Sequence, residues 1–273
     1  MIKPQQNFFL SDSKIHTVGS SACVLPPPAH HIYEVFRVIS GVPLFVEDHM
    51  QRLEHSLSAV NIHADMNAIQ LDVKKLMQLN GFATGNIKII VWQHETTIHT
   101  MILYDNHLYP SSEQFMNGIR IGTMQHIRKD PNVKLFDAEM RNIAQSKINE
   151  QDFYEILLVT PDGYITEGSR SNIFFIQSDT IITPPSDQVL EGVTRKKVIS
   201  LIKDNSMHFS ERKVHLNELP EFDSIFLTGT SRRVLPVHTI DPFAKQYNTN
   251  HQLIRDLQNR FLQLCENYIK SKK

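Results

Sequence analysis

Long apolar runs and cysteines are both scarce in this sequence of 273 residues. No apolar stretch approaches the roughly 20 residues that a membrane-spanning helix needs. Residues 1–7 lead into an apolar cluster of only three residues, which does not resemble a signal-peptide core. The two cysteines, Cys23 and Cys265, lie near opposite ends of the chain, which argues against a disulfide framework or a zinc site. We therefore expect a cytoplasmic protein.

An excess of charge of one sign is also lacking. The 28 Lys and Arg residues nearly balance the 29 Asp and Glu residues, so no electrostatic attraction to nucleic acid or to an anionic membrane is expected. The sequence has no Gly-x-Gly-x-x-Gly fingerprint and no Walker loop, which weighs against dinucleotide and triphosphate binding. Segment 94–99 misses the metalloprotease pattern by one residue, and His30 and His31 have no third ligand nearby. We predict no bound metal ion.

Residues 1–105 are predicted to form a small α+β domain. Residues 1–30 are expected to be irregular, and alternating apolar residues then predict a hairpin of strands 31–39 and 44–46. Apolar side chains recur every three to four residues from Glu47, which predicts an amphipathic helix. A second helix over 67–79 and two strands over 86–93 and 96–104 complete this domain.

The polar segment 106–117 is the predicted interdomain linker, and residues 118–273 form the predicted larger, strand-rich C-terminal domain. Strands are expected over 119–124, 155–159, 173–176, 179–183, 224–227 and 234–237, and helices over 138–149, from Gly192, and over 252–269. With 41% hydrophobic residues, the chain has enough apolar side chains for two cores.

Lys134 is the candidate for covalent chemistry. It is flanked by Val133, Leu135 and Phe136, after a Pro-Asn turn and before a predicted helix. Partial removal from water disfavours the ammonium form of an amine and lowers its pKa, as a Schiff-base lysine requires. A lysine beside apolar residues more often only covers a surface with its stem, so other motifs must support this interpretation.

Two glycine-containing, hydroxyl-rich segments are candidates for holding a phosphate group. Residues 192–194 precede a predicted helix, and residues 228–231 follow a buried strand. Both offer backbone N–H groups and hydroxyls to an anion. Either segment alone is ordinary, and Gly-Val-Thr before a helix is usually only a cap. Together with Arg52, at the edge of the apolar stripe of its helix, they predict one phosphate site.

Glu167 lies in the polar bend 166–169 between two predicted strands. One interpretation is a solvated loop carboxylate. The alternative is a carboxylate that holds the proton of a pyridinium ring on a cofactor, which would make the ring a better electron sink.

These segments together resemble the class IV family of pyridoxal-phosphate enzymes, which includes the branched-chain and D-amino-acid aminotransferases and the aminodeoxychorismate lyases. The resemblance runs from about residue 8 to about residue 237. Its most specific part is 162–174, whose order and spacing after Lys134 are similar to those of the family. The other segments that carry it are 33–53, 131–134, 192–195 and 226–231.

The resemblance implies a two-domain α/β fold of type IV, with pyridoxal 5'-phosphate in the cleft between the domains and a homodimer whose partner closes the site. Lys134 would form a Schiff base with the cofactor and move the substrate α-proton, and Glu167 would pair with the pyridine nitrogen. The implied phosphate-binding residues are Arg52, Val193, Thr194, Thr230 and Ser231.

The departures from the family pattern fall on the substrate side. A glycine-rich turn before Tyr33 is replaced by 28–31, which reads Pro-Ala-His-His, and Phe153 stands where the branched-chain enzymes have a tyrosine. Arg232 and Arg233 replace the small residue and glutamate usual after the 228–231 turn. The predicted substrate-binding residues are Tyr33, His31, Arg170 and Arg232, the arginines as forks for a carboxylate.

The leading interpretation is an aminotransferase that moves an amino group between a small amino acid, branched-chain-like or D-configured, and a 2-oxo acid by ping-pong chemistry. One alternative is a lyase that releases pyruvate and 4-aminobenzoate from aminodeoxychorismate. Another is a non-catalytic binding protein that keeps the fold and the cofactor, which the altered turn at 29–31 would favour. The sequence leaves the stereochemistry of the substrate open.

Overall fold

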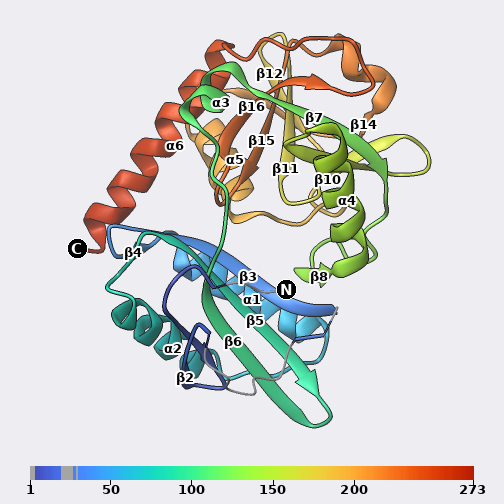
Figure 1. The fold of residues 1–273 in the computed structure, drawn as a ribbon. Helices are drawn as coiled ribbons and strands as arrows, with labels where there is room; N and C mark the ends of the chain where they lie inside the picture. The colour runs from blue at the N-terminus through green and yellow to red at the C-terminus, as the bar shows by residue number, and fades with distance from the viewer. Residues whose placement is uncertain (1–3, 20–26, 29) are drawn as a thin grey trace. The chain divides into compact units, whose positions relative to one another are not determined.

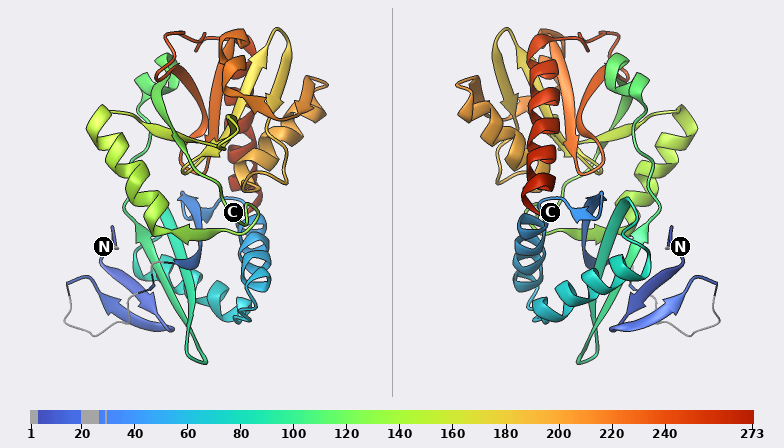
Figure 2. Two further views of the ribbon diagram at one scale, coloured as in Figure 1. Left: turned by 90° about the vertical axis from the view of Figure 1, so that its right-hand side faces the viewer. Right: turned by 90° about the vertical axis from the view of Figure 1, so that its left-hand side faces the viewer.

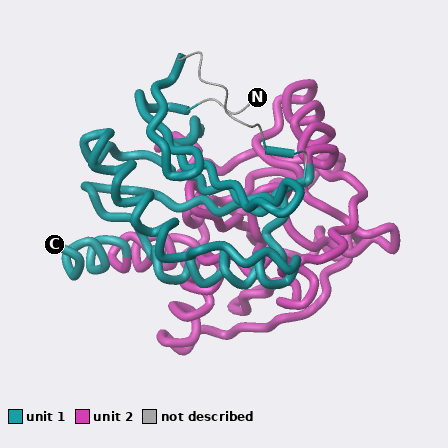
Figure 3. The backbone as a smooth tube through the Cα atoms, turned by 90° about the horizontal axis from the view of Figure 1, so that it is seen from below, with its two compact units in different colours: residues 1–108, 133–137, 265–273 teal, residues 109–132, 138–264 magenta. Residues whose placement is uncertain are grey.

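The computed structural model describes residues 4–19, 27–28 and 30–273 and divides into two compact units, each with its own sheet (Figure 1). The first unit contains residues 1–108, 133–137 and 265–273, and the second contains 109–132 and 138–264 (Figure 3). Two segments that were predicted within the C-terminal domain, Val133–Asp137 and Cys265–Lys273, thus belong to the first unit. Within the described part of the chain, no helix has both the length and the hydropathy to cross a membrane.

The first unit is built on a seven-stranded antiparallel sheet with the order β2-β1-β6-β5-β3-β4, and β8 also pairs with β3. Its strands are β1 (Phe8–Ser11), β2 (Lys14–Thr17), β3 (His30–Ile39), β4 (Val42–Pro43), β5 (Gly85–His94), β6 (Thr97–Asp105) and β8 (Leu135–Asp137). The pairing of β8 with β3 joins Ile32 to Leu135, and so it is the element that draws the Lys134 segment into this unit.

Two sequence predictions in this unit were wrong. Residues 1–30 are not irregular throughout, because β1 and β2 form a hairpin whose turn residues Asp12 and Ser13 both have positive φ. The partner of β3 is Val42–Pro43 rather than 44–46. The chain reverses earlier than expected because Ser40 and Gly41 adopt φ values of 51° and 76°, which suit a tight hairpin turn.

Helices α1 (Val46–Ala59) and α2 (Met66–Leu79) confirm the two predicted helices. Their apolar stripes pack against one face of the sheet, where Leu53 and Leu76 bury completely beside Phe36 and Ile87. Burial of one such side chain stabilises the fold by about 1.5–3 kcal/mol. This packing also holds α1 beside β3, where His49 and Arg52 contact Glu34.

The second unit is built on a nine-stranded mixed sheet with the order β13-β12-β11-β15-β16-β7-β9-β10-β14. Its strands are β7 (Ile119–Gln125), β9 (Glu155–Val159), β10 (Tyr164–Gly168), β11 (Asn172–Gln177), β12 (Thr180–Thr183), β13 (His208–Glu211), β14 (Val214–His215), β15 (Ser224–Gly229) and β16 (Arg233–Ile240). The predicted strands are confirmed with small shifts at their ends, whereas β10, β13 and β14 were not predicted, and β10 includes Glu167 from the predicted bend at 166–169. Side chains from the central strands, including Ile173, Ile225 and Leu235, form its main core.

The second unit also contains α3 (Ser112–Asn117), α4 (Ala138–Gln151), α5 (Val193–Asp204), the short 3-10 helix η1 (Leu216–Glu221) and most of α6 (Gln252–Ser271). Helix α3 lies inside the predicted linker, because Ser111 and Gln114 form a reciprocal capping box that starts a helix. Helix α6 is one continuous helix of 20 residues (Figure 2). Its last turns belong to the first unit, where Tyr268 and Lys272 hydrogen-bond Glu47 at the start of α1.

Candidate active site

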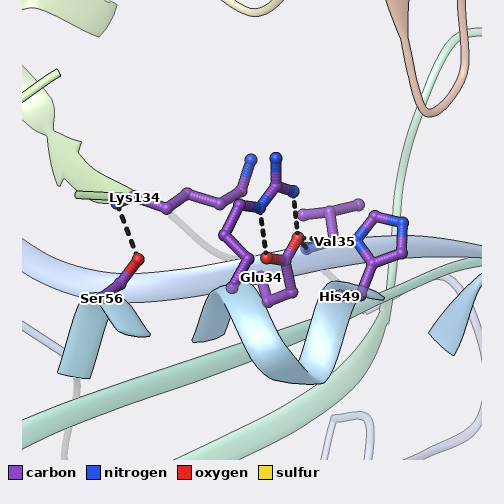
Figure 4. Close-up of polar contacts among 6 residues, drawn as sticks. Glu34, Val35, His49, Ser56 and Lys134 are labelled. Carbon is purple, nitrogen blue, oxygen red and sulfur yellow. Dashed lines mark hydrogen bonds and ion pairs between the residues drawn. The ribbon is translucent and has the colours of Figure 1, made fainter. Parts of the chain in front are cut away.

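Lys134 is held by its backbone between β3 and α1. Its N–H donates to Ser56 Oγ at 3.0 Å (Figure 4), and its carbonyl accepts from the Tyr33 N–H at 3.2 Å. The side chain is half-buried, and Nζ lies 4.9 Å from the centre of the Tyr33 ring. The amine is therefore partly removed from water and sits on a rigid support, as the sequence interpretation required.

Next to this lysine, a buried carboxylate holds an arginine in a fixed orientation. Glu34 is fully buried, and Arg52 donates to it from Nε at 2.9 Å and from Nη2 at 2.7 Å, in the forked geometry of a strong ion pair. The Val35 N–H and His49 Nδ1 also contact Glu34 Oε1, at 2.8 and 3.0 Å (Figure 4). Arg52 thus has little freedom to turn.

The protonation of this network follows from burial and from its two cations. Burial alone would raise the pKa of Glu34, but the charges of Arg52 and Lys134 hold the pKa below the ordinary value for a carboxyl group, so Glu34 is ionised. Burial lowers the pKa of His49, so its imidazole is neutral and donates from Nδ1 to Glu34. Arg52 was predicted from the sequence, whereas the roles of Glu34 and His49 were not. A signal was present, because His49 and Arg52 are three positions apart on one helix face.

In the second unit, Glu167 on β10 is buried rather than solvated, so the interpretation as a solvated loop carboxylate was wrong. Its Oε1 lies 2.9 Å from Arg128 Nε. Its Oε2 accepts from the Leu190 N–H at 3.2 Å and from Asn172 Nδ2 at 3.4 Å. Arg128 thus places a positive charge beside the Glu167 carboxyl group, and this contact was not anticipated from the sequence.

The N-terminus of α5 lies beside the same asparagine. Gly192 is the N-cap and has no side chain to cap the first turn, and the first helical hydrogen bond runs from the Lys196 N–H to the Gly192 carbonyl. A Cβ at Gly192 would lie 2.1 Å from Asn172 Oδ1, so only glycine fits there. The N–H groups of Val193 and Thr194 therefore lie at a helix start with no side-chain cap, a geometry suited to an anion.

The turn after β15 supplies hydroxyl groups. Ser231 is buried, and Thr228 is fully buried with its Oγ1 lacking a hydrogen-bond partner among the described residues. Gly229 differs from Gly192, because a Cβ there would meet nothing closer than 3.6 Å. The hydroxyls of Thr194, Thr230 and Ser231, the α5 N-terminus and the Glu167 carboxyl group fit the phosphate and the protonated ring nitrogen of pyridoxal phosphate in their donor and acceptor chemistry.

Arg232 has a buried partner inside the protein. Its Nη2 lies 3.0 Å from Glu155 Oε2, and its Nη1 donates to the Arg170 carbonyl at 3.3 Å. Glu155 is fully buried and also accepts from Ser169 Oγ at 2.6 Å and Ser171 Oγ at 3.1 Å. Burial would raise the pKa of Glu155, but Arg232 lowers it below the ordinary value. This pair ties the bend that follows Glu167 to the turn that carries Ser231.

The other residues predicted on the substrate side lie as follows. Arg170 is exposed and donates to Gln145 Oε1 at 2.8 Å, and Phe153 packs in an apolar cluster against Gly122. His31 and Tyr33 are buried on β3. Ala29 lies outside the described residues. Substrate binding by Tyr33, His31, Arg170 and Arg232 stays a prediction.

The structure thus brings Lys134, Arg52 and Tyr33 together in the first unit. In the second unit, Asn172 joins Glu167 to the start of α5, and Arg232 joins the 169–171 bend to the 228–231 turn. These are the chemical parts that a pyridoxal-phosphate enzyme needs: an amine for the covalent bond, cations and N–H groups for the phosphate, and a carboxylate for the ring nitrogen.

The amino-acid sequence of this chain is similar to a known protein family and to individual proteins. A sequence model of the family described as amino-transferase class IV matches residues 31–240. The D-alanine aminotransferase of Bacillus licheniformis is 27% identical over 230 residues, which cover 77% of this chain and 78% of that protein. A probable branched-chain-amino-acid aminotransferase of Rickettsia bellii is 27% identical over 241 residues, 83% of each chain.

Solved structures agree in fold. The branched-chain amino acid aminotransferase of Escherichia coli superimposes with a TM-score of 0.84 at 16% identity, over 96% of this chain and 95% of the other. The T.th. branched-chain amino acid aminotransferase, solved with pyridoxamine 5'-phosphate, has a TM-score of 0.84 at 19% identity, over 97% of this chain and 96% of the other. At these identities the similarity shows a common fold.

Proposed function

Because the chain belongs to the class IV aminotransferases, which use pyridoxal phosphate, we propose that it transfers an amino group between a small amino acid and a 2-oxo acid. The observation that carries the proposal is the placement of Lys134. Its backbone is fixed by Ser56 and Tyr33, and its amine lies beside the buried Glu34–Arg52 pair. A fixed and partly desolvated amine is what the covalent chemistry needs.

When bound, pyridoxal phosphate supplies an electron sink that stabilises negative charge at the substrate α-carbon. Lys134 Nζ would hold the cofactor covalently between turnovers. Once released, the same amine would act as a general base and take the proton from the substrate α-carbon. It would then act as a general acid and deliver the proton to the cofactor. Its mounting on β3 and α1 keeps it within reach for both transfers.

The remaining residues would bind and orient. Arg52, held by Glu34, is proposed to bind the cofactor phosphate, and so are the N–H groups of Val193 and Thr194 and the hydroxyls of Thr230 and Ser231. Glu167 would accept a hydrogen bond from the protonated ring nitrogen. Together these residues would keep the cofactor bound when Lys134 is released from it.

For the substrate we propose a small aliphatic amino acid, as the names of the relatives suggest: one is called a D-alanine aminotransferase and others branched-chain-amino-acid aminotransferases. We also propose a cytoplasmic homodimer. The near absence of cysteine supports a reducing compartment. Light scattering of the purified protein tests the oligomeric state, and a mass of one chain would contradict it.

The test of the function is an absorbance titration of the purified protein loaded with pyridoxal phosphate. Single amino acids, alanine and leucine in both L and D form, are added without any oxo acid. An aminotransferase converts its visible cofactor band to the shorter-wavelength band of the amino form, and the amino acid that causes the change gives the substrate class and its configuration. Later addition of 2-oxoglutarate should restore the first band.

Other outcomes would point to the alternatives. A visible band that no amino acid changes would contradict the aminotransferase, and the release of pyruvate from aminodeoxychorismate would then identify a lyase. A band that responds to neither would identify a binding protein. A protein that forms no band at all would refute the role of Lys134.

A further inference from the structure

Lys88 occupies an unusual place for a lysine. It lies in the middle of β5, between the fully buried Ile87 and Ile89, and it pairs across the sheet with Val35 on β3 and Leu103 on β6. Its own side chain is half-buried. Among the described residues, no carboxylate lies within ion-pair distance of Lys88. A cation in the centre of a sheet without an acidic partner is costly unless something else meets its charge.

The surroundings of Lys88 are aromatic. Lys88 Nζ lies 5.5 Å from the centre of the Tyr33 ring and 5.3 Å from the centre of the Phe136 ring. Lys134 Nζ lies 4.9 Å from the same Tyr33 ring. The lysine that carries the proposed chemistry and the unmatched cation are therefore both placed around one tyrosine.

His31 adds a second unmatched group at this place. It is 6% exposed, and its ring stacks on Phe136 with 4.6 Å between centroids and 9° between planes. Its Nδ1 lies 2.7 Å from the Pro28 carbonyl and so must donate to it, which leaves Nε2 with a lone pair. No described residue bonds this buried Nε2. Burial lowers the pKa of His31 to about 4, so the ring is neutral and Nε2 is an acceptor.

The first unit therefore offers an unmatched cation and an unmatched acceptor against the Phe136 ring, close to Lys134. We propose that Lys88 and His31 recognise the charged head of an α-amino acid: Lys88 pairs with the carboxylate, and His31 Nε2 accepts a hydrogen bond from the amino group. The inference rests on the proposed function and deepens it. A 2-oxo acid or a simple carboxylic acid offers the carboxylate without the N–H, so Lys88 serves both kinds of ligand and His31 serves only the amino acid.

A purely structural reading is that Lys88 covers apolar surface with its stem and gains from cation–π contact. The two readings differ in measurable ways. Replacement of Lys88 by methionine keeps the stem and removes the charge, and Lys88→Arg keeps the charge. His31→Phe keeps a ring for stacking on Phe136 and removes Nε2. Lys74→Met is the matched control, since Lys74 is an exposed lysine of the same unit on α2.

The experiment measures KM and kcat of the cofactor-loaded enzyme for the responsive amino acid, and the inhibition constant of 4-methylvalerate, a carboxylic acid that lacks the amino group. For Lys88→Met we expect both KM and the inhibition constant to rise about 10- to 100-fold, as for a lost charge-assisted hydrogen bond. Lys88→Arg should recover most of this loss. His31→Phe should raise KM about 10-fold and leave the inhibition constant within about twofold. Lys74→Met should change neither constant.

The proposal is refuted if Lys88→Met leaves both constants within about twofold of the wild type, or if the wild type transfers the amino group of leucine but does not bind 4-methylvalerate. The part that concerns His31 is refuted if His31→Phe changes both constants alike or changes neither. If the wild type shows no amino transfer, the proposed function fails instead. Thermal stabilisation of the protein by 4-methylvalerate, with and without Lys88→Met, then still decides whether Lys88 binds a carboxylate.

Discussion

The two units of this protein use a buried carboxylate in different ways. In the first unit, Glu34 holds the Arg52 side chain, and the charge of Lys134 helps to keep the pKa of Glu34 below its ordinary value. In the second unit, Glu155 holds Arg232, whose other nitrogen reaches a backbone carbonyl, and binds two serine hydroxyls of a bend. The first carboxylate orients side chains, whereas the second stabilises the conformation of the backbone.

This difference matches what each unit would bring to the cofactor. Side chains such as Lys134 and Arg52 have many rotamers, and a buried ion pair limits them. Backbone N–H groups at the start of α5 need no such aiming, because the helix itself orients them. Their position depends instead on the conformation of the surrounding loops, which the Glu155–Arg232 pair and Gly192 help to maintain. Substitutions in each unit test this difference.

The largest effect is expected for Lys134→Ala. Loss of the amine removes both the covalent bond and the proton transfer, so amino transfer should fall by at least about 10³-fold. The fold should remain, because the hydrogen bonds that Lys134 makes with Ser56 and Tyr33 involve only its backbone. Activity and the visible cofactor band are measured beside circular dichroism. Appreciable residual transfer in a folded variant would contradict the assignment of Lys134.

Glu34→Gln should have the next largest effect. It leaves Arg52 without its counter-charge at a buried position, which costs about 3–5 kcal/mol of unfolding free energy. It should also weaken cofactor binding, because Arg52 loses its fixed orientation. Urea unfolding of the apoprotein and titration with pyridoxal phosphate measure the two effects separately. Unchanged cofactor affinity would show that Glu34 serves stability alone.

The pH dependence gives a control for this variant. The pKa of Glu34 is lower in the folded protein than the ordinary 4.5, so its contribution to stability is fully present above about pH 4.5 and is lost as pH falls toward the folded value. The wild type should therefore lose stability over this acidic range, and Glu34→Gln should lose less. An equal loss in both proteins would contradict the ionised state of Glu34.

Glu155→Gln should cost a similar 3–5 kcal/mol of unfolding free energy, because the buried Arg232 keeps its charge. We expect a smaller change in cofactor affinity than for Glu34→Gln, since the effect reaches the site only through the backbone. The double variant Glu155→Leu with Arg232→Met removes both charges and should recover most of the stability. If the double variant is no more stable than Glu155→Gln, the loss does not come from the uncompensated arginine.

The smallest effect is expected for the two glycines. Gly192→Ala forces Asn172 to move, since the new Cβ would lie 2.1 Å from Oδ1, and should cost about 1–3 kcal/mol. It should also weaken cofactor binding, because Asn172 supports Glu167. Gly229→Ala is the matched control, with no atom closer than 3.6 Å. Thermal unfolding with and without cofactor distinguishes the two variants, and equal effects would contradict the close approach at Gly192.

Local periodicity predicted the long elements because each is amphipathic or apolar throughout. The strand β9 has the predicted bounds, and α1 and α2 begin within one residue of theirs. The three-residue strand β8 had no such signal, because it forms only through its pairing with β3 about 100 positions earlier in the chain. Helix α3 was missed for another reason, since the polar segment 106–117 was interpreted as a linker although Ser111 caps a helix.

By itself, the sequence determined the class of chemistry, since Lys134, Arg52, Glu167 and the two hydroxyl-rich segments occur in an order and spacing that can be recognised without coordinates. Only the tertiary structure decided which groups carry charge and what holds them. Glu34 and His49 are 15 positions apart, and Glu155 and Arg232 are 77 apart, yet each pair interacts. Burial sets their protonation, and burial depends on the packing of distant segments. For the same reason, Lys88 and His31 became visible as unmatched groups only in the folded chain.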